Sequence, residues 1–223
     1  MCGRYSLATP DLHGLDDRFT FRGEGMDYEP RYNVAPTQKV LTVVGYPERQ
    51  AEYMRWGIIP FWSKTEKTKY SLINARDDRL LESKVFAPLL PGRRCLIVAD
   101  GFYEWRKEGK ERVPMRITLK GGEPFGFAGL WSPWTNPETE EVLNTCAIIT
   151  TSPNELTEPI HNRMPVILPY EAEEMWLDSR VQNTETLMSL LRPFPADSME
   201  AYEVSSLVSS AKNDVPECIL SIG

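Results

Sequence analysis

The pattern of apolar and polar positions predicts short strands. The apolar runs are rich in β-branched and aromatic residues and end at Gly, Pro or Asn, which is typical of strands bounded by turns. Because 113–119 and 125–131 flank Gly121-Gly122, we expect these two segments to pair as a hairpin. The predicted strands are 40–45, 51–56, 95–99, 113–119, 125–131 and 143–151.

Helical patterns are short and few. They cover 77–85, 170–178 and 184–191. Asn183 or Thr184 can cap the third helix, and the prolines that follow it, Pro193 and Pro195, end it. The mixture predicts an α+β fold: a single β-rich domain over residues 1–223, mostly antiparallel and barrel-like, with flanking short helices.

Composition places the chain among ordinary globular proteins. Of the 223 residues, 41% are hydrophobic and 26% charged, and no apolar run approaches the ~20 residues of a membrane helix. The first residues lack the apolar core of a secretory signal, so we expect a cytoplasmic protein. The four cysteines form no CxxC pair, which disfavours a zinc site; no metal and no cofactor is expected.

The net charge of −7 disfavours a purely electrostatic nucleic-acid binder. Binding to DNA would need a local basic groove within an acidic surface. The candidates for that groove are Arg4, Arg31, Arg76, Arg93, Arg94, Arg163 and Lys212.

Cys2 stands out because of its position. Once Met1 is removed, Cys2 presents an α-amine of pKa ~8 and a thiol of pKa ~8.5 on adjacent carbons. Such a 1,2-aminothiol reacts with aldehydes: the amine forms a Schiff base and the thiol closes a thiazolidine ring. Position alone favours an inert terminal residue. Class II glutamine amidotransferases also begin with a processed Cys-Gly, whose thiol attacks an amide.

Two further segments place polar side chains next to apolar residues. Asn74 and Arg76 lie two apart, so an extended backbone puts both on one face, although a turn-forming Asn beside a surface Arg is the default explanation for this segment alone. Glu104 stands between two aromatic residues, which favours a raised pKa and proton shuttling. A carboxylate paired with nearby Arg106 or Lys107 is about as plausible.

A loop and an aromatic stretch complete the candidates. His161 lies between two prolines and two residues before Arg163, in a rigid loop suited to chemistry, though a lone histidine is more often structural. Trp62 borders a polar run and can stack on an unpaired base, whereas Trp56 reads as a core residue.

Taken in order, these segments resemble one family, the SRAP proteins (SOS response-associated peptidases, or abasic site processing proteins). The resemblance extends from residue 1 to about residue 215. The segments that carry it are MCGRY, RYNVAPT, RWGIIPFW, LINARDD, RRCLIVADGFYEW, AIITTSPN, IHNRMPVIL and VSSLVSSAKND.

The resemblance implies a partner and a set of residue roles. The partner is single-stranded DNA with an abasic site, whose ring-opened sugar carries an aldehyde. Cys2 would be the cross-linking nucleophile and Asn74 would orient its amine. Glu104 would shuttle protons, and His161 would help to open the sugar ring. The residues that would bind DNA are Arg4, Asn33, Trp62, Arg76, Arg163 and, with less support from the motif, Lys212.

Secondary activities follow from the same resemblance. The Schiff base permits β-elimination of the 3′ phosphate, hence AP lyase activity, and the older peptidase description would mean self-removal of Met1. We expect a monomer, associated with the nucleoid when bound to DNA. Two alternatives stay open: an N-terminal-nucleophile amidohydrolase or peptidase, and a non-covalent single-strand binding module.

Overall fold

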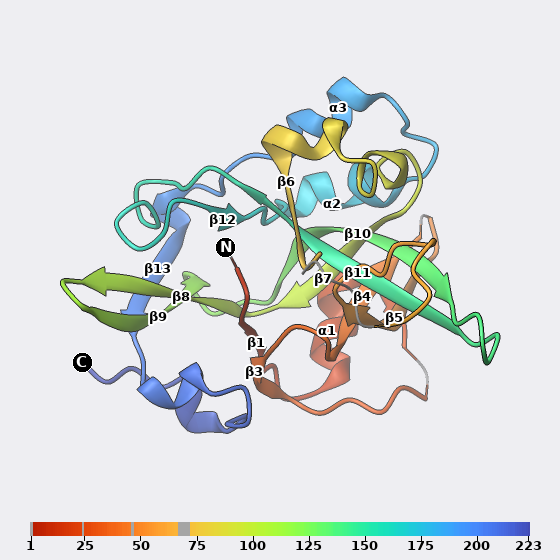
Figure 1. Ribbon diagram of the computed structural model, residues 1–223. Helices are drawn as coiled ribbons and strands as arrows, with labels where there is room; N and C mark the ends of the chain where they lie inside the picture. The colour runs from red at the N-terminus through yellow and green to blue at the C-terminus, as the bar shows by residue number, and fades with distance from the viewer. Residues whose placement is uncertain (1, 24, 46, 67–71) are drawn as a thin grey trace.

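In a computed structural model of the chain, residues 2–23, 25–45, 47–66 and 72–223 are described (Figure 1). The strands are β1 (Tyr5–Leu7), β2 (Phe21–Arg22), β3 (Arg31–Val34), β4 (Lys39–Val44), β5 (Arg49–Trp56), β6 (Asn74–Arg76), β7 (Arg94–Ala99), β8 (Gly101–Glu108), β9 (Glu111–Leu119), β10 (Phe125–Thr135), β11 (Val142–Thr151), β12 (Met164–Pro165) and β13 (Met199–Glu203). The helices are α1 (Leu12–Phe19), α2 (Tyr170–Leu177) and α3 (Thr184–Ser189), with 3₁₀ turns η1 (Asp77–Glu82), η2 (Ala87–Leu89), η3 (Ala196–Ser198), η4 (Ser206–Ser209) and η5 (Pro216–Cys218).

Strands of the larger sheet close into a barrel. β7 pairs with β4 and β10, β4 pairs with β5, and β10 pairs with β11. A parallel contact between β5 and β11 closes the ring. Trp56, at the closing contact, is fully buried, and its ring lies 5.3 Å from that of Tyr5. The barrel therefore supplies a rigid apolar core beneath β1.

The smaller sheet holds the start of the chain. Its order is β13-β9-β8-β1-β3, and β7 of the barrel runs directly into β8 through Asp100. The pairing of β1 with β8 extends one residue towards the amino terminus, where the Tyr103 N–H donates to the Arg4 carbonyl at 2.9 Å. Cys2 is thereby fixed beside the middle of β8.

The helices lie outside the strands. Figure 1 shows α2 and α3 on one side of the barrel and α1 on the other. The Trp176 indole of α2 donates to the Cys95 carbonyl of β7 at 3.0 Å. Arg94, expected in a basic groove, is instead buried under α2 and bonded to main-chain carbonyls, so that expectation was wrong. The carbonyls are those of Leu90, Pro91, Trp176, Asp178 and Val181.

Most predicted elements are confirmed. All six predicted strands are present, as β4, β5, β7, β9, β10 and β11, and the helices expected at 170–178 and 184–191 are α2 and α3. Asn183 is the N-cap of α3, accepting the Thr186 N–H at 2.8 Å. The helix expected at 77–85 is a 3₁₀ turn, η1, followed by a turn in which the Ser83 hydroxyl accepts two N–H groups. The β-rich domain with short flanking helices is also confirmed.

The predicted hairpin between 113–119 and 125–131 is wrong. β9 pairs with β8 and β13, whereas β10 pairs with β7 and β11 in the other sheet. Gly109, at φ +60°, allows the tight turn that joins β8 to β9 as a hairpin. Gly121 and Gly122, both at positive φ, then carry the chain across to the barrel.

One helix was not predicted. α1 is a single amphipathic stretch in which Leu15 and Phe19 are the buried residues, and Asp11 caps it by accepting the Gly14 N–H at 2.9 Å. No helix within the described residues is both long and apolar enough to cross a lipid bilayer.

Candidate active site around Cys2

Cys2 is a fully buried residue at the edge of the smaller sheet. Its thiol lies 3.8 Å from the Arg4 carbonyl. Burial, reinforced by the nearby negative charge of Glu104, raises the pKa of this thiol well above its usual range. The thiol is therefore neutral near pH 7. Met1, whose removal would free the Cys2 amine, lies outside the described residues.

Asn74 reaches Cys2 from the barrel. β6 adds to β11 in parallel, with Asn74 opposite Ile148, and the Asn74 Nδ2 donates to the Cys2 carbonyl at 2.8 Å. The Asn74 Oδ1 is buried and has no hydrogen-bond partner among the residues the structure describes. A buried amide oxygen without a donor is costly, so this atom is suited to accept a proton donor that arrives next to Cys2.

Glu104 approaches Cys2 from β8. The residue is buried and lies opposite Met115 of β9. Burial raises the pKa of its carboxyl to about 7, against the positive charge at the amino terminus of the chain, which lowers it. The expected alternative was a pairing of Glu104 with Arg106 or Lys107; Arg106 instead pairs with Glu108 at 2.6 Å and with Glu203 at 3.8 Å, and neither cation is among the causes of the Glu104 pKa shift. A carboxyl that titrates near neutrality is suited to move protons in both directions.

His161 lies in the loop between β11 and β12. Its Nδ1 is 3.1 Å from both the N–H and the carbonyl oxygen of Arg163. Burial lowers the pKa of the imidazole, and the positive charge at the amino terminus lowers it further. The positive charge at the amino terminus therefore lowers the pKa of both Glu104, on β8, and His161, on this loop.

The arginines near the site differ in their exposure and in the bonds that they already form within the protein. Arg163 is largely buried and bonds Asp77 at 2.6 Å. Arg4 donates to Asn33 Oδ1 at 2.8 Å and to the Val208 carbonyl at 2.6 Å. Arg76 is exposed and forms a two-pronged ion pair with Asp78. Arg76 is thus the exposed member of the three, while Arg4 is half-buried.

The sequence matches, over residues 1–211, the family described as SOS response associated peptidase (SRAP). The chain belongs to the SRAP family. The predicted resemblance is thereby confirmed. An SRAP relative called abasic site processing protein YoqW, from Bacillus subtilis (strain 168), is 48% identical over 99% of this chain and 100% of that protein. The abasic site processing protein HMCES of Gallus gallus is 34% identical over 98% of this chain and 74% of that protein.

Solved structures share the SRAP architecture. A crystal structure of a protein from Bacteroides thetaiotaomicron superposes with a TM-score of 0.87 at 27% identity, over 99% of both chains. A second, from Bordetella bronchiseptica, has a TM-score of 0.79 at 28% identity, over 92% of this chain and 100% of that one.

The predicted SRAP catalytic residues come from distant parts of the chain. Cys2 and Asn74 are in direct contact, and the charge of Glu104 acts on the Cys2 thiol. Asn33 is fully buried: its Oδ1 accepts from Arg4, and its Nδ2 donates to three carbonyls of the segment 208–213. Direct contact between Asn33 and DNA stays a prediction. The geometry favours an indirect role, in which Asn33 holds the side chain of Arg4 in place.

Trp62 and Lys212 are accessible. The side chain of Trp62 is 55% exposed and that of its neighbour Phe61 80%, and their rings form an edge-to-face pair 4.8 Å apart. Lys212 is exposed on the segment that Asn33 anchors. Part of the polar run beyond Trp62, residues 67–69, lies outside the described residues.

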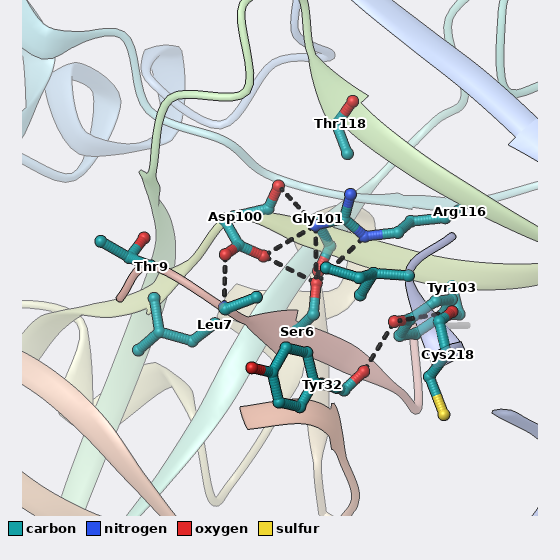
Figure 2. A network of polar contacts seen from close by, with 12 residues as sticks. Ser6, Leu7, Thr9, Tyr32, Asp100, Gly101, Tyr103, Arg116, Thr118 and Cys218 are labelled. Atoms are coloured by element: carbon teal, nitrogen blue, oxygen red, sulfur yellow. Dashed lines mark hydrogen bonds and ion pairs between the residues drawn. The ribbon is translucent and has the colours of Figure 1, made fainter. Parts of the chain in front are cut away.

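A buried polar network behind the site was not predicted. Figure 2 shows Ser6, Asp100 and Arg116 joined where β1, β8 and β9 meet. The Ser6 hydroxyl donates to Asp100 at 2.7 Å, and Arg116 bonds the same carboxylate at 2.9 Å. A Cβ at Gly101 would lie 2.8 Å from the Arg116 Nε and would have to displace the guanidinium from this network. The network holds β1, and with it Cys2, against β8.

Among the described residues, no three His, Cys, Asp or Glu side chains gather in an arrangement able to hold a metal ion.

Proposed function

We propose that this SRAP protein processes abasic sites by forming a covalent bond between Cys2 and the aldehyde of an abasic site in single-stranded DNA. The observation that carries the proposal is the contact of Asn74 with Cys2, which leaves a buried amide oxygen ready for the Cys2 amine. The names of the relatives, abasic site processing proteins, support the same lesion as the substrate.

The amine reacts first. After Met1 is lost, the Cys2 α-amine can donate a hydrogen bond to the Asn74 Oδ1 while its lone pair faces the incoming aldehyde carbon. The reference pKa of such an amine is ~8, so a useful fraction is neutral near pH 7. The buried thiol is protonated under the same conditions, because burial raises its pKa. This difference sets the order of the two nucleophiles.

The thiol closes the linkage. Attack of the amine on the aldehyde and loss of one water give an imine. The sulfur then forms a bond to the imine carbon, and the thiol proton moves to the nitrogen. The product is a five-membered thiazolidine, and the overall reaction releases one water without an oxidant or reductant.

Glu104 and His161 are proposed to move the protons. A Glu104 carboxyl of pKa about 7 can take a proton from the attacking amine and return it to the departing hydroxyl. His161, whose Nδ1 is held by Arg163, is proposed to protonate the ring oxygen of the sugar, which opens the ring to the aldehyde. The same two groups support slow reversal of the linkage.

The DNA is proposed to reach Cys2 past exposed cationic and aromatic residues. Arg76 and Lys212 are accessible for phosphates, and Trp62 is accessible for stacking on a base. Arg4 and Asn33 are proposed to act indirectly, by fixing the position of the segment that carries Lys212. We propose that a monomer suffices, because these residues all come from one chain.

Two further activities follow from the same intermediate and terminus. The imine acidifies the neighbouring carbon of the sugar and so permits β-elimination of the 3′ phosphate, which is AP lyase activity. Removal of Met1 by the protein itself would account for the word peptidase in the family description. An amidohydrolase reaction is less well supported, because it needs a thiolate and burial keeps the Cys2 thiol neutral.

The test is a denaturing gel of the protein mixed with single-stranded DNA that carries one abasic site. We expect a slowly migrating adduct, which is absent with intact DNA and absent with Cys2→Ala. Cys2→Ser separates this chemistry from amide hydrolysis, because serine can attack an amide but gives a far less stable oxazolidine. An adduct of undiminished yield with Cys2→Ala would refute the proposal.

A further inference from the structure

Asp77 lies where the two halves of the proposed site meet. It follows β6, the strand that carries Asn74, and begins η1. Its Oδ2 accepts the Thr151 hydroxyl at 2.7 Å, which ties it to the end of β11. Its Oδ1 accepts Arg163 Nη2 at 2.6 Å. One carboxylate thus joins β6, β11 and the loop that carries His161.

Arg163 is held mainly by this carboxylate. Its side chain is 11% exposed and that of Asp77 is 19% exposed, so the ion pair is shielded from water. Arg163 Nη2 also donates to the Thr150 carbonyl and, at 3.3 Å, to the Thr150 hydroxyl. A second carboxylate, that of Asp78, lies 3.7 Å from Arg163 Nη1 but is 47% exposed. Removal of Asp77 would leave the shielded guanidinium with only this longer, solvent-exposed ion pair, so the position of Arg163 depends mainly on Asp77.

The backbone of Arg163 in turn holds the imidazole of His161. Its N–H and its carbonyl oxygen both lie 3.1 Å from the His161 Nδ1. The N–H can donate to Nδ1 when that nitrogen carries no proton, and the carbonyl can accept from Nδ1 when it does, which includes the ring whose Nε2 has given its proton to the sugar. His161 can therefore gain and lose a proton without turning its ring.

We propose that Asp77 is a positioning residue for His161, acting through Arg163. This inference rests on the proposed function only in that His161 acts on the abasic sugar; the contacts themselves do not depend on it. Asp77 carries no substrate contact in this scheme. Asp77 fixes the imidazole of His161, which does contact the sugar, and it sets the distance between that imidazole and the strand bearing Asn74.

The first measurement needs no DNA. The chain has two histidines, His161 and the exposed His13, so the ¹⁵N spectrum of histidine-labelled protein is readily assigned. In the wild type, at a pH where the ring is neutral, we expect His161 to show a single tautomer, unlike His13. In Asp77→Ala, the ¹⁵N shifts of His161 should move towards the averaged values of His13. Unchanged His161 shifts would overturn the proposal.

The second measurement follows the rate of cross-linking. We expect Asp77→Ala to slow the reaction about tenfold or more, because a misplaced catalytic group costs up to about 100-fold. In a His161→Gln background, Asp77→Ala should cause little further loss. If it slows His161→Gln as much as the wild type, Asp77 does not act through His161 and the proposal is wrong.

Controls separate positioning from charge and from folding. Glu48→Ala removes an equal charge from an exposed ion pair with Arg22 and should leave both readouts unchanged. Asp77→Asn keeps the shape of the side chain and should give the same direction of change if Asp77→Ala folds poorly. If the wild type forms no adduct, the proposed function fails, while the ¹⁵N spectra still decide the role of Asp77.

Discussion

At the scale of single residues, burial decides which groups around Cys2 are ionised. The thiol of Cys2 is kept neutral, whereas the carboxyl of Glu104 is brought to a pKa of about 7. Both effects come first from removal of water, and both favour the neutral form of an acid. An amine and a half-protonated carboxyl are the pair that imine formation requires near neutral pH.

The raised pKa of Glu104 has a consequence for stability. The stability that neutral Glu104 contributes is present below about pH 4.5, its ordinary pKa, and is lost as the pH rises through about 7. A rise of this size corresponds to about 3 kcal/mol. Glu104→Gln should therefore unfold at higher urea than the wild type at about pH 8.5 and at similar urea near pH 4.5. The exposed Glu108→Gln is the control, and equal effects of the two variants would argue against a buried, titrating Glu104.

Asn74 should control the rate of linkage more than the affinity for DNA. Asn74→Ala removes both the bond to the Cys2 carbonyl and the oxygen proposed for the amine. We expect the cross-linking rate to fall about 10- to 100-fold, with binding of intact single-stranded DNA changed less than about twofold. Rates from quenched gels and affinities from fluorescence anisotropy check this. Asn162→Ala, on an exposed loop position, should change neither; a wild-type rate in Asn74→Ala would exclude the orienting role.

At this scale, residue type and position along the chain predict much of the candidate site. Cys2, Asn74 and Glu104 could be selected because their chemistry is unusual in their sequence context. Asp77 could not, because an acidic residue at the start of a predicted helix has an ordinary explanation in the helix dipole. The burial of Asn33 was also hidden, since its three carbonyl partners lie about 180 residues away along the chain.

At the scale of elements, the barrel requires close packing between β7 and β10. Gly129 lies opposite Cys95, and a Cβ at Gly129 would come within 2.8 Å of the Cys95 sulfur. Gly129→Ala should therefore lower the free energy of unfolding by about 1–3 kcal/mol. Gly92→Ala, where a Cβ meets nothing within 4 Å, is the matched control in urea denaturation. Equal stability of the two variants would contradict this packing.

Six strands could be predicted from local patterns, but β8, the shorter strands and the partners of the strands could not. The segments that form β9 and β10 read as a hairpin, yet each pairs within a different sheet. The partner of a strand depends on which connections make tight turns, as Gly109 does between β8 and β9, and on long-range closure, such as the parallel contact between β5 and β11. Alternation of apolar residues along one strand carries no information on either.

At the scale of the whole molecule, a net charge of −7 has to be reconciled with DNA binding. Several arginines are held in ion pairs that are more shielded from water than the pair of Arg76 with Asp78, as Arg31 is with Asp214 and Arg163 with Asp77. These pairs reduce the number of cations open to phosphates. We therefore expect modest affinity for intact single strands, with the covalent bond supplying retention at the lesion.

Two substitutions should separate the electrostatic and stacking parts of binding. Arg76→Gln should reduce the slope of log K against log salt by about 0.7, the value for one phosphate contact on a single strand. Trp62→Ala should weaken binding by about 1–3 kcal/mol while leaving that slope unchanged. Anisotropy titrations over a range of salt measure both. An unchanged slope for Arg76→Gln would remove Arg76 from the proposed DNA path, and an unaltered affinity for Trp62→Ala would remove Trp62.

The most direct test of the central claim is the intact mass of the adduct after alkylation of its thiols under denaturing conditions. The free protein should lack Met1 and take up four alkyl groups, one for each cysteine. The adduct should equal the protein plus the abasic DNA minus one water, and it should take up one alkyl group fewer, because the Cys2 sulfur is held in the thiazolidine. An adduct that still accepts four alkyl groups, or that retains Met1, would contradict the account.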